Sequence, residues 1–264
     1  MTSEDILLLV NNEFKGKRKG NFFYRDNTIV NTSFSKSYKG EIVVDEGAQF
    51  IAANVFEWYS CISIQLPSSL LAIGEFAFSN CKIKKLNFPQ GLLFIAENAF
   101  HRSDIETVTL GNSIEIISRD AFSNCCKLKE LNLGDNIKFI QDRAFDECSE
   151  LKTIIFPKSL KSIEDSAFAN CQNLETIIFQ SNKVDIAYNA FYGCDNLQKI
   201  VTPENIYTSV EDFLDDLEEI KKHSNSKLPL TLSEEEKRSY AFRLYALRKE
   251  YSSNDEITEM IDGD

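Results

Sequence analysis

Cysteine is the side chain in this sequence whose type and spacing are best suited to chemistry. Five cysteines recur at a regular interval: Cys81, Cys125, Cys148, Cys171 and Cys194. Metal binding needs cysteines or histidines at close spacing, and Cys125 and Cys126 are the only such pair. The α-carbons of cysteines in neighbouring repeats would lie close to the distance range that allows a disulfide. The alternative is a small, buried apolar side chain under a tight loop, and we expect most of the seven cysteines to be free thiols.

The other residue types supply little catalytic material. The two histidines, His101 and His223, have no partner at ligand spacing, and we expect both at the surface. Glycine-rich phosphate loops and a nucleophile elbow are absent from the sequence. Carboxylate pairs such as Asp215–Asp216 lie in acidic runs, which are typical of a solvated helix face. The sequence therefore predicts no enzyme activity, no cofactor and no metal.

Length and charge narrow the class of protein. The chain has 264 residues, of which 43% are hydrophobic, so it can bury a sizeable core. Its net charge of -12 disfavours nucleic acid and anionic membrane surfaces. No apolar run approaches the ~18 residues of a membrane helix, and the acidic N-terminal stretch does not resemble a secretory signal. We expect a cytoplasmic protein without membrane insertion.

A repeat of 22 or 23 residues determines the architecture. Ladder phenylalanines follow this period at Phe34, Phe56, Phe78, Phe100, Phe122, Phe145, Phe168 and Phe191. Five residues before each of them stands a ladder isoleucine: Ile29, Ile51, Ile73, Ile95, Ile117, Ile140, Ile163 and Ile186. Two positions in strict phase predict a solenoid of stacked turns, each too small to close its own core.

Each repeat divides into two halves. The downstream half, as in Leu174-x-x-Ile177-x-Phe179, has the period of two that predicts a short strand. The upstream half places Ile163, Ala167, Phe168 and Cys171 at helical spacing, which predicts a short helix or 3₁₀ segment.

These anchors resemble the BspA-type leucine-rich repeat over about Ile29 to Pro203, although Tyr59 and Ser103 stand where other repeats have cysteine. The resemblance implies an α/β repeat, a leucine-rich-repeat solenoid with a parallel β-sheet on its concave face. It also implies a binding role, commonly in surface adhesins, and no enzyme activity. We expect an N-terminal cap over residues 1–28 with a solvated basic loop, the solenoid over 29–203, and an acidic helical appendage over 204–264.

The appendage carries 16 acidic and 8 basic residues, so it holds -8 of the net charge. Ser209 is the expected N-cap of an amphipathic helix that includes Phe213 and Leu217. Ser233 and Glu236 form a capping box for a second helix. Its apolar residues lie in two stripes, one of Tyr240, Leu244, Leu247 and Tyr251, and the other of Phe242 and Tyr245.

Strand alternation predicts the binding surface. If Ile154 and Phe156 point into the core, their neighbours in the strand point outward. In the last three strands these outward residues are Thr153 and Ile155, Thr176 and Ile178, and Lys199 and Val201. The apolar members form a row that needs a cover. Either the C-terminal helix covers it, through Phe213, Leu217 or Tyr240, or a protein partner does.

Three functions are compatible with these features. The first is a non-enzymatic module that binds a protein through the strand face, the C-terminal helices, or both. The second is a targeting or regulatory subunit whose C-terminal helices carry the activity of a larger assembly. The third is a surface adhesin, exported without an evident signal. The sequence identifies neither the partner nor the oligomeric state.

Overall fold

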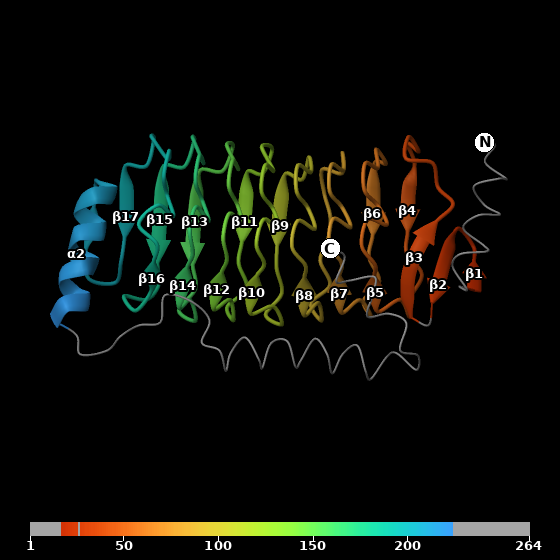
Figure 1. The fold of residues 1–264 in the computed structure, drawn as a ribbon, viewed down its shortest axis with the longest axis horizontal. Coiled ribbons are helices and arrows are strands. Elements are labelled where there is room, and N and C mark those ends of the chain that lie inside the picture. Colours follow the sequence, from red (N-terminus) through yellow and green to blue (C-terminus); the bar gives the residue numbers. More distant parts are fainter. Residues whose placement is uncertain (1–16, 26, 224–264) are drawn as a thin grey trace.

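The chain forms an elongated solenoid of stacked turns, shown in the computed structural model of Figure 1. The structure describes residues 17–25 and 27–223. Most turns contribute one strand to each of two faces, which we call the strand face and the short-strand face. On the strand face, the turn around Lys85 has only an isolated bridge to Thr107. The longer strands make the strand face: β4 (Glu41–Val43), β6 (Ser63–Gln65), β9 (Thr107–Thr109), β11 (Glu130–Asn132), β13 (Thr153–Phe156), β15 (Thr176–Phe179) and β17 (Lys199–Val201).

Pairing along the strand face is parallel but interrupted. Strand β4 pairs with β6, β9 with β11, and β13 with β15 and β17. Strands β11 and β13 are neighbours in the stack, yet they belong to different sheets. The strand face therefore has a break beside β13.

The short-strand face carries a two-residue strand from each turn. These strands are β5 (Phe50–Ile51), β7 (Ala72–Ile73), β8 (Phe94–Ile95), β10 (Ile116–Ile117), β12 (Phe139–Ile140), β14 (Ser162–Ile163) and β16 (Asp185–Ile186). They pair in parallel, with one break between β8 and β10. At this break the Ser118 hydroxyl donates to the Ile95 carbonyl over 2.6 Å. In the next turn Gln141 donates its backbone N–H to the equivalent Ile117 carbonyl over 3.0 Å. A side-chain hydrogen bond thus replaces one backbone hydrogen bond between neighbouring turns.

The prediction of a short helix or 3₁₀ segment in each repeat is wrong. After each two-residue strand the described repeats continue in consecutive turns. Residues in the left-handed region, such as Asn80, Asn124 and Asn170 with φ of 56°, 57° and 56°, interrupt helical geometry. Backbone N–H groups in this half also donate to the next turn of the solenoid. For example, Phe78 donates to the Ala99 carbonyl over 2.7 Å. The described repeats are therefore all β and turn, so the predicted α/β repeat is corrected to a β-solenoid.

The ladder residues build the core, as predicted. All eight ladder isoleucines are buried, and so are the ladder phenylalanines from Phe56 to Phe191, whereas Phe34 is partly buried. Rings of successive turns stack with centroids 5.0 to 5.7 Å apart. One continuous column of stacked rings therefore runs along the solenoid.

An antiparallel hairpin covers the N-terminal end. It consists of β1 (Lys17–Lys19), β2 (Phe22–Arg25) and β3 (Thr28–Thr32), and β3 continues in parallel to β5. Phe22 is buried and meets Phe56 edge-on at 6.4 Å. Residues 17–25 of the predicted cap thus lie against the first turn. The prediction of a basic loop is wrong for residues 17–19, which form a strand. Residues 1–16 of the predicted cap precede the described residues.

The C-terminal end is closed by β18 (Ile206–Tyr207) and α2 (Val210–His223), the only helix among the described residues. Strand β18 pairs antiparallel with β17 across the predicted boundary at residue 203. Ser209 is the N-cap, as predicted, since its hydroxyl accepts the Asp212 N–H over 3.3 Å. The predicted second helix, from Ser233, falls outside the described residues. No helix in the described part of the chain is long and apolar enough to cross a membrane.

Candidate functional site

The structure brings the six predicted site residues together at the C-terminal end of the strand face. Ile155 pairs in register with Ile178, and Ile178 with Val201, so these three side chains form one row. Thr153, Thr176 and Lys199 form the parallel row beside it. The alternate residues Ile154, Ile177 and Ile200 are buried in the core. Ile155 lies on β13, the edge strand of this sheet, and is 49% exposed.

The apolar row has a fourth member that was not predicted. Ile206 in β18 lies opposite Val201 and is 67% exposed. A tight turn reverses the chain here, because Thr202 donates its N–H to the Asn205 carbonyl over 2.9 Å. Pro203 and Asn205 between two apolar stretches are the sequence signal that predicts such a hairpin. We call Ile155, Ile178, Val201 and Ile206 the outer row.

A groove of about 480 Å³ adjoins the outer row at the break between β11 and β13. Ile155 and Thr153 form one wall, and the walls and rim also include Lys129, Glu130 and Lys152. The break in strand pairing explains the position of the groove, because β13, β15 and β17 on one side of it are joined by continuous pairing, and so are β9 and β11 on the other. An apolar row beside a polar hollow can hold a ligand segment that is apolar on one side and charged on the other.

Ion pairs cross the turns next to the groove. Glu106 contacts Lys84 over 3.1 Å and Lys129 over 3.5 Å, and Lys129 also reaches Glu150 over 3.6 Å. The hydrogen bond from Lys84 holds the pKa of Glu106 below its usual value. These groups are solvated, so they contribute little to stability and shape the surface charge instead.

Helix α2 leaves the outer row open and packs at the end of the core. Phe213 is 2% exposed and stacks on Phe179 at 5.4 Å, and Phe179 points inward. Tyr207 donates a hydrogen bond to Asp216, which links α2 to β18. Burial, and then this hydrogen bond, raise the pKa of the Tyr207 hydroxyl. The prediction that Phe213 covers the outer row is therefore wrong. The alternatives through Leu217 and Tyr240 lie outside the described side chains.

The periodic cysteines have a shared contact that the sequence did not reveal. Each thiol donates to the carbonyl of the ladder phenylalanine in the preceding turn. The distances are 2.7 Å for Cys81 to Phe56, 3.1 Å for Cys125 to Phe100, 3.3 Å for Cys148 to Phe122, 3.3 Å for Cys171 to Phe145 and 3.1 Å for Cys194 to Phe168. All seven cysteines are unbridged and only Cys126 is exposed. Burial raises the pKa of Cys125 to about 12, so it is a poor nucleophile.

Tyr59 shows that the contact does not depend on sulfur, whereas the other departure from the pattern, Ser103, places its hydroxyl 3.3 Å from the Cys125 thiol. Tyr59 occupies the cysteine position of its turn, and its hydroxyl donates to the Phe34 carbonyl over 2.9 Å. The departure at Tyr59 therefore preserves the contact. The periodic cysteines serve the backbone of the solenoid and not a reactive centre.

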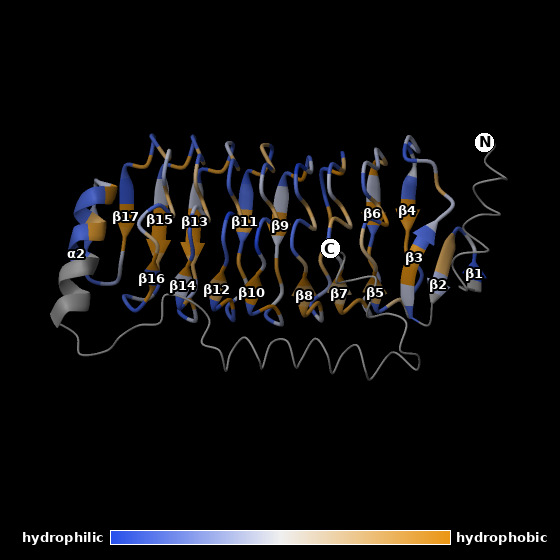
Figure 2. Ribbon diagram, in the orientation of Figure 1, coloured by the Kyte–Doolittle hydropathy of each residue, from blue (hydrophilic) through white to orange (hydrophobic). Residues whose placement is uncertain are grey.

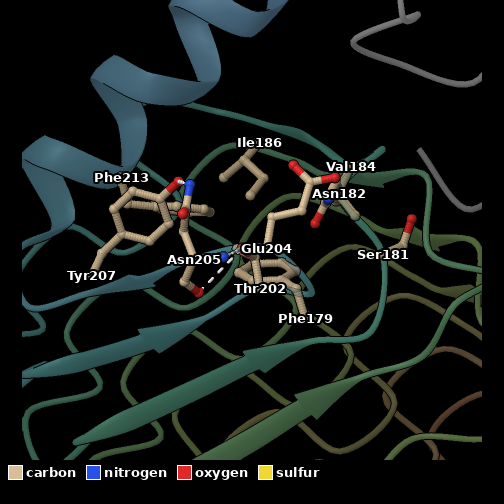
Figure 3. Close-up of a pocket in the computed structure, with 10 residues that line it drawn as sticks. All are labelled: Phe179, Ser181, Asn182, Val184, Ile186, Thr202, Glu204, Asn205, Tyr207 and Phe213. Carbon is tan, nitrogen blue, oxygen red and sulfur yellow. Dashed lines mark hydrogen bonds between the residues drawn. The ribbon is translucent and has the colours of Figure 1, made fainter.

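The remaining polar features are also structural. His101 lies at the surface but is partly buried, and its Nδ1 bonds the Ser123 hydroxyl over 2.6 Å, while the His223 side chain is outside the description. Burial and the neighbouring Arg102 lower the pKa of His101. A cavity of about 20 Å³ lies beside Tyr207 and Phe213 (Figure 3). It has room for a water molecule and not for a substrate. Within the described residues, no three His, Cys, Asp or Glu side chains are grouped to hold a metal.

Comparisons with known proteins agree with this architecture. The model of the BspA type leucine rich repeat region, in six copies, matches residues 27–152 and 115–243. A leucine-rich repeat protein of T. pallidum is 24% identical, with a TM-score of 0.62 over 83% of this chain and 100% of that one. A leucine-rich repeat protein from Bacteroides ovatus is 26% identical, with a TM-score of 0.47 over 71% of this chain and 61% of that one. This chain thus spans less than two thirds of the Bacteroides protein. The search of the curated proteins found no match.

Proposed function

Because the chain belongs to the BspA-type leucine-rich repeat family, we propose that it is a non-enzymatic module that binds a protein partner. The repeats supply a rigid scaffold, and the C-terminal end of the strand face supplies the contact surface. The site residues are Thr153, Ile155, Thr176, Ile178, Lys199 and Val201, extended by Ile206.

The outer row is the observation that supports this function. Its four side chains stand in register across β13, β15, β17 and β18, and both end members are about half exposed or more. A row of β-branched side chains on a solvated face lowers its free energy when a partner removes it from water. Its neighbour, the groove with Lys129 and Lys152, offers cations for orientation. The packing of Phe213 in the core leaves this surface accessible from the side of α2.

A double substitution tests the proposal. Ile155→Asp with Ile178→Asp places two charges in the outer row and leaves the core unchanged, so the melting temperature should stay near the wild-type value. Proteins that co-purify with the wild-type chain from its native host should be lost, and affinity for the purified partner should fall by at least 100-fold. The control is Thr107→Asp with Thr109→Asp on β9, which changes the same face away from the row.

Retention of the partner by the folded Ile155/Ile178 double variant would contradict this site. Loss of binding in the Thr107/Thr109 control as well would show that the partner contacts the whole strand face and not the outer row alone. Removing residues 224–264 separates the two main functions. A binding module retains its partner without them, and a regulatory subunit whose activity lies in its C-terminal helices does not.

We also propose that the protein works in a reducing compartment such as the cytoplasm. The buried, unbridged cysteines that donate to carbonyls support this location, since oxidation would remove those donors. Cell fractionation is the direct test, and recovery at the cell surface would favour the adhesin alternative.

A further inference from the structure

The short-strand face carries a second row of side chains on the outside of the solenoid. Within each two-residue strand the ladder isoleucine points inward, so the residue before it points outward. These outward residues, which we call the back row, are Phe50, Ala72, Phe94, Ile116, Phe139, Ser162 and Asp185. Ile116 and Phe139 form a cluster of their own, separate from the main core. Figure 2 shows the apolar character of β10 and β12.

The back row is buried although it lies outside the core. Ile116 and Phe139 are 4% and 3% exposed, and Ser162 is 1% exposed. Helix α2 contacts β18 at the end of the stack. Lys161 lies over the Phe139 ring at 5.4 Å, but one flexible side chain does not bury two large apolar residues. The described strands and turns therefore account for only part of the burial of Ile116 and Phe139.

We infer that the C-terminal segment, residues 233–251, docks on the back row as an amphipathic helix. The gradient of burial along the row supports this occupant. Phe50, Ala72 and Phe94, near the N-terminal end, are half-buried, whereas Ser162 and Asp185, next to the C-terminal end, are almost fully buried. The chain leaves the described structure at that same end, after His223. The described chain begins at the opposite end, at β1, where the burial is weakest.

The dimensions of the segment fit the row. Neighbouring turns are ~4.8 Å apart, so the row from Phe50 to Asp185 measures roughly 29 Å. A helix over residues 233–251 would be roughly 28 Å long. The connection of residues 224–232 can span up to about 30 Å, which allows the segment to turn back along the solenoid. In Figure 1, α2 runs from the level of β17 to that of β16, toward the short strands.

The chemistry of the two surfaces is also complementary. The stripe of Tyr240, Leu244, Leu247 and Tyr251 offers an apolar face to Phe94, Ile116 and Phe139. The segment carries five cations, namely Lys237, Arg238, Arg243, Arg248 and Lys249. Three of its four carboxylates, Glu234, Glu235 and Glu236, precede them, so residues 237–251 carry five cations against one carboxylate, Glu250. The turns that follow the short strands carry carboxylates at Glu75, Glu97, Asp142 and Asp165. This docking differs from the binding proposed above, because it uses the opposite strands and leaves the outer row free.

Hydrogen exchange of the full-length chain, followed by mass spectrometry, tests the inference. Amides of residues 237–251 should be protected in the wild type, and Leu244→Asp with Leu247→Asp should speed their exchange by on the order of tenfold or more. Phe139→Asp should do the same from the other surface. Ile155→Asp is the matched control, since it places the same charge on the strand face and should leave residues 237–251 protected.

Several results would overturn the inference. Unprotected amides in the wild type would show that the segment does not dock. Equal protection in the Leu244/Leu247 variant and the wild type would exclude the apolar stripe as the contact. Faster exchange in residues 1–16 instead, on Phe139→Asp, would assign the cover to the N-terminal segment. Protection that disappears on tenfold dilution of the protein would assign it to a second copy. The Leu244/Leu247 variant lies outside the solenoid, so the test survives if Phe139→Asp fails to fold.

Discussion

In six turns the cysteine position carries a hydrogen-bond donor to the preceding ladder phenylalanine. The sequence presented five cysteines, Tyr59 and Ser103 in phase, and only the geometry showed that the cysteines and Tyr59 donate to the same kind of carbonyl, while the Ser103 hydroxyl contacts the Cys125 thiol. A carbonyl inside the stack that lost its donor would be left without water to replace it. The donor therefore explains the choice of residue better than size alone.

Tyr59→Phe tests this role. The substitution removes only the hydroxyl that donates to the Phe34 carbonyl, so the free energy of unfolding should fall by about 1 kcal/mol. Tyr192→Phe is the control, because Tyr192 is 72% exposed and should leave stability unchanged. Equal melting curves for both variants and the wild type would contradict a donor role at this position.

The thiols make a second prediction at the same scale. Near pH 8 the folded protein should react rapidly with a thiol reagent only at Cys126, and denatured protein from its native source should release most of its seven thiols. Burial raises the pKa of Cys61 to about 11 and of Cys125 to about 12, above the ~8.5 of an unfolded thiol. Stability is thus full below about pH 8.5 and falls as the pH rises through the folded-state pKa values. Two or three bridges in the native-source protein would indicate an oxidising compartment.

At the scale of elements, the register of the repeat was predictable and the form of its second half was not. The ladder positions, the strand alternation and the row of Ile155 and Ile178 all follow from a period of two or of 22 to 23 residues. The spacing of Ile163, Ala167 and Phe168 fits a helix equally well in isolation. The structure differs because these N–H groups bond the next turn, as Phe168 does to the Ala190 carbonyl over 2.8 Å. A hydrogen bond between turns produces no periodic pattern in the sequence of a single turn, so the sequence could not reveal it.

Asn124 tests the turn geometry of this second half. Its φ of 57° lies in the left-handed region, which asparagine tolerates and β-branched residues do not. Asn124→Val should destabilise the protein by about 1–3 kcal/mol, whereas Asn124→Gly, the matched variant, should change stability much less. Denaturant unfolding of the two variants measures the difference. If valine were tolerated as well as glycine, the repeat would not contain the left-handed turn.

At the scale of the whole molecule, the solenoid is one column closed at both ends. Phe22 meets the first fully buried ring, and Phe213 stacks on Phe179 at the last turn. Between them each ring stacks on the rings of the turns before and after it, so the stability of one turn depends on the turns on either side. The caps remove the two exposed ends that such a stack would otherwise present for aggregation.

A ring removed from the middle of the column should therefore weaken the entire molecule. Phe145 is fully buried and stacks between Phe122 at 5.3 Å and Phe168 at 5.1 Å, so Phe145→Ala deletes contacts in both directions. The expected loss is about 3–5 kcal/mol of unfolding free energy, seen as a lower midpoint in thermal melts. Hydrogen exchange should rise in the turns on both sides of the substitution, since neither can replace the lost ring. Faster exchange confined to the substituted turn would show that the turns are independently stable, and an unchanged midpoint would mean that the column does not stabilise the fold.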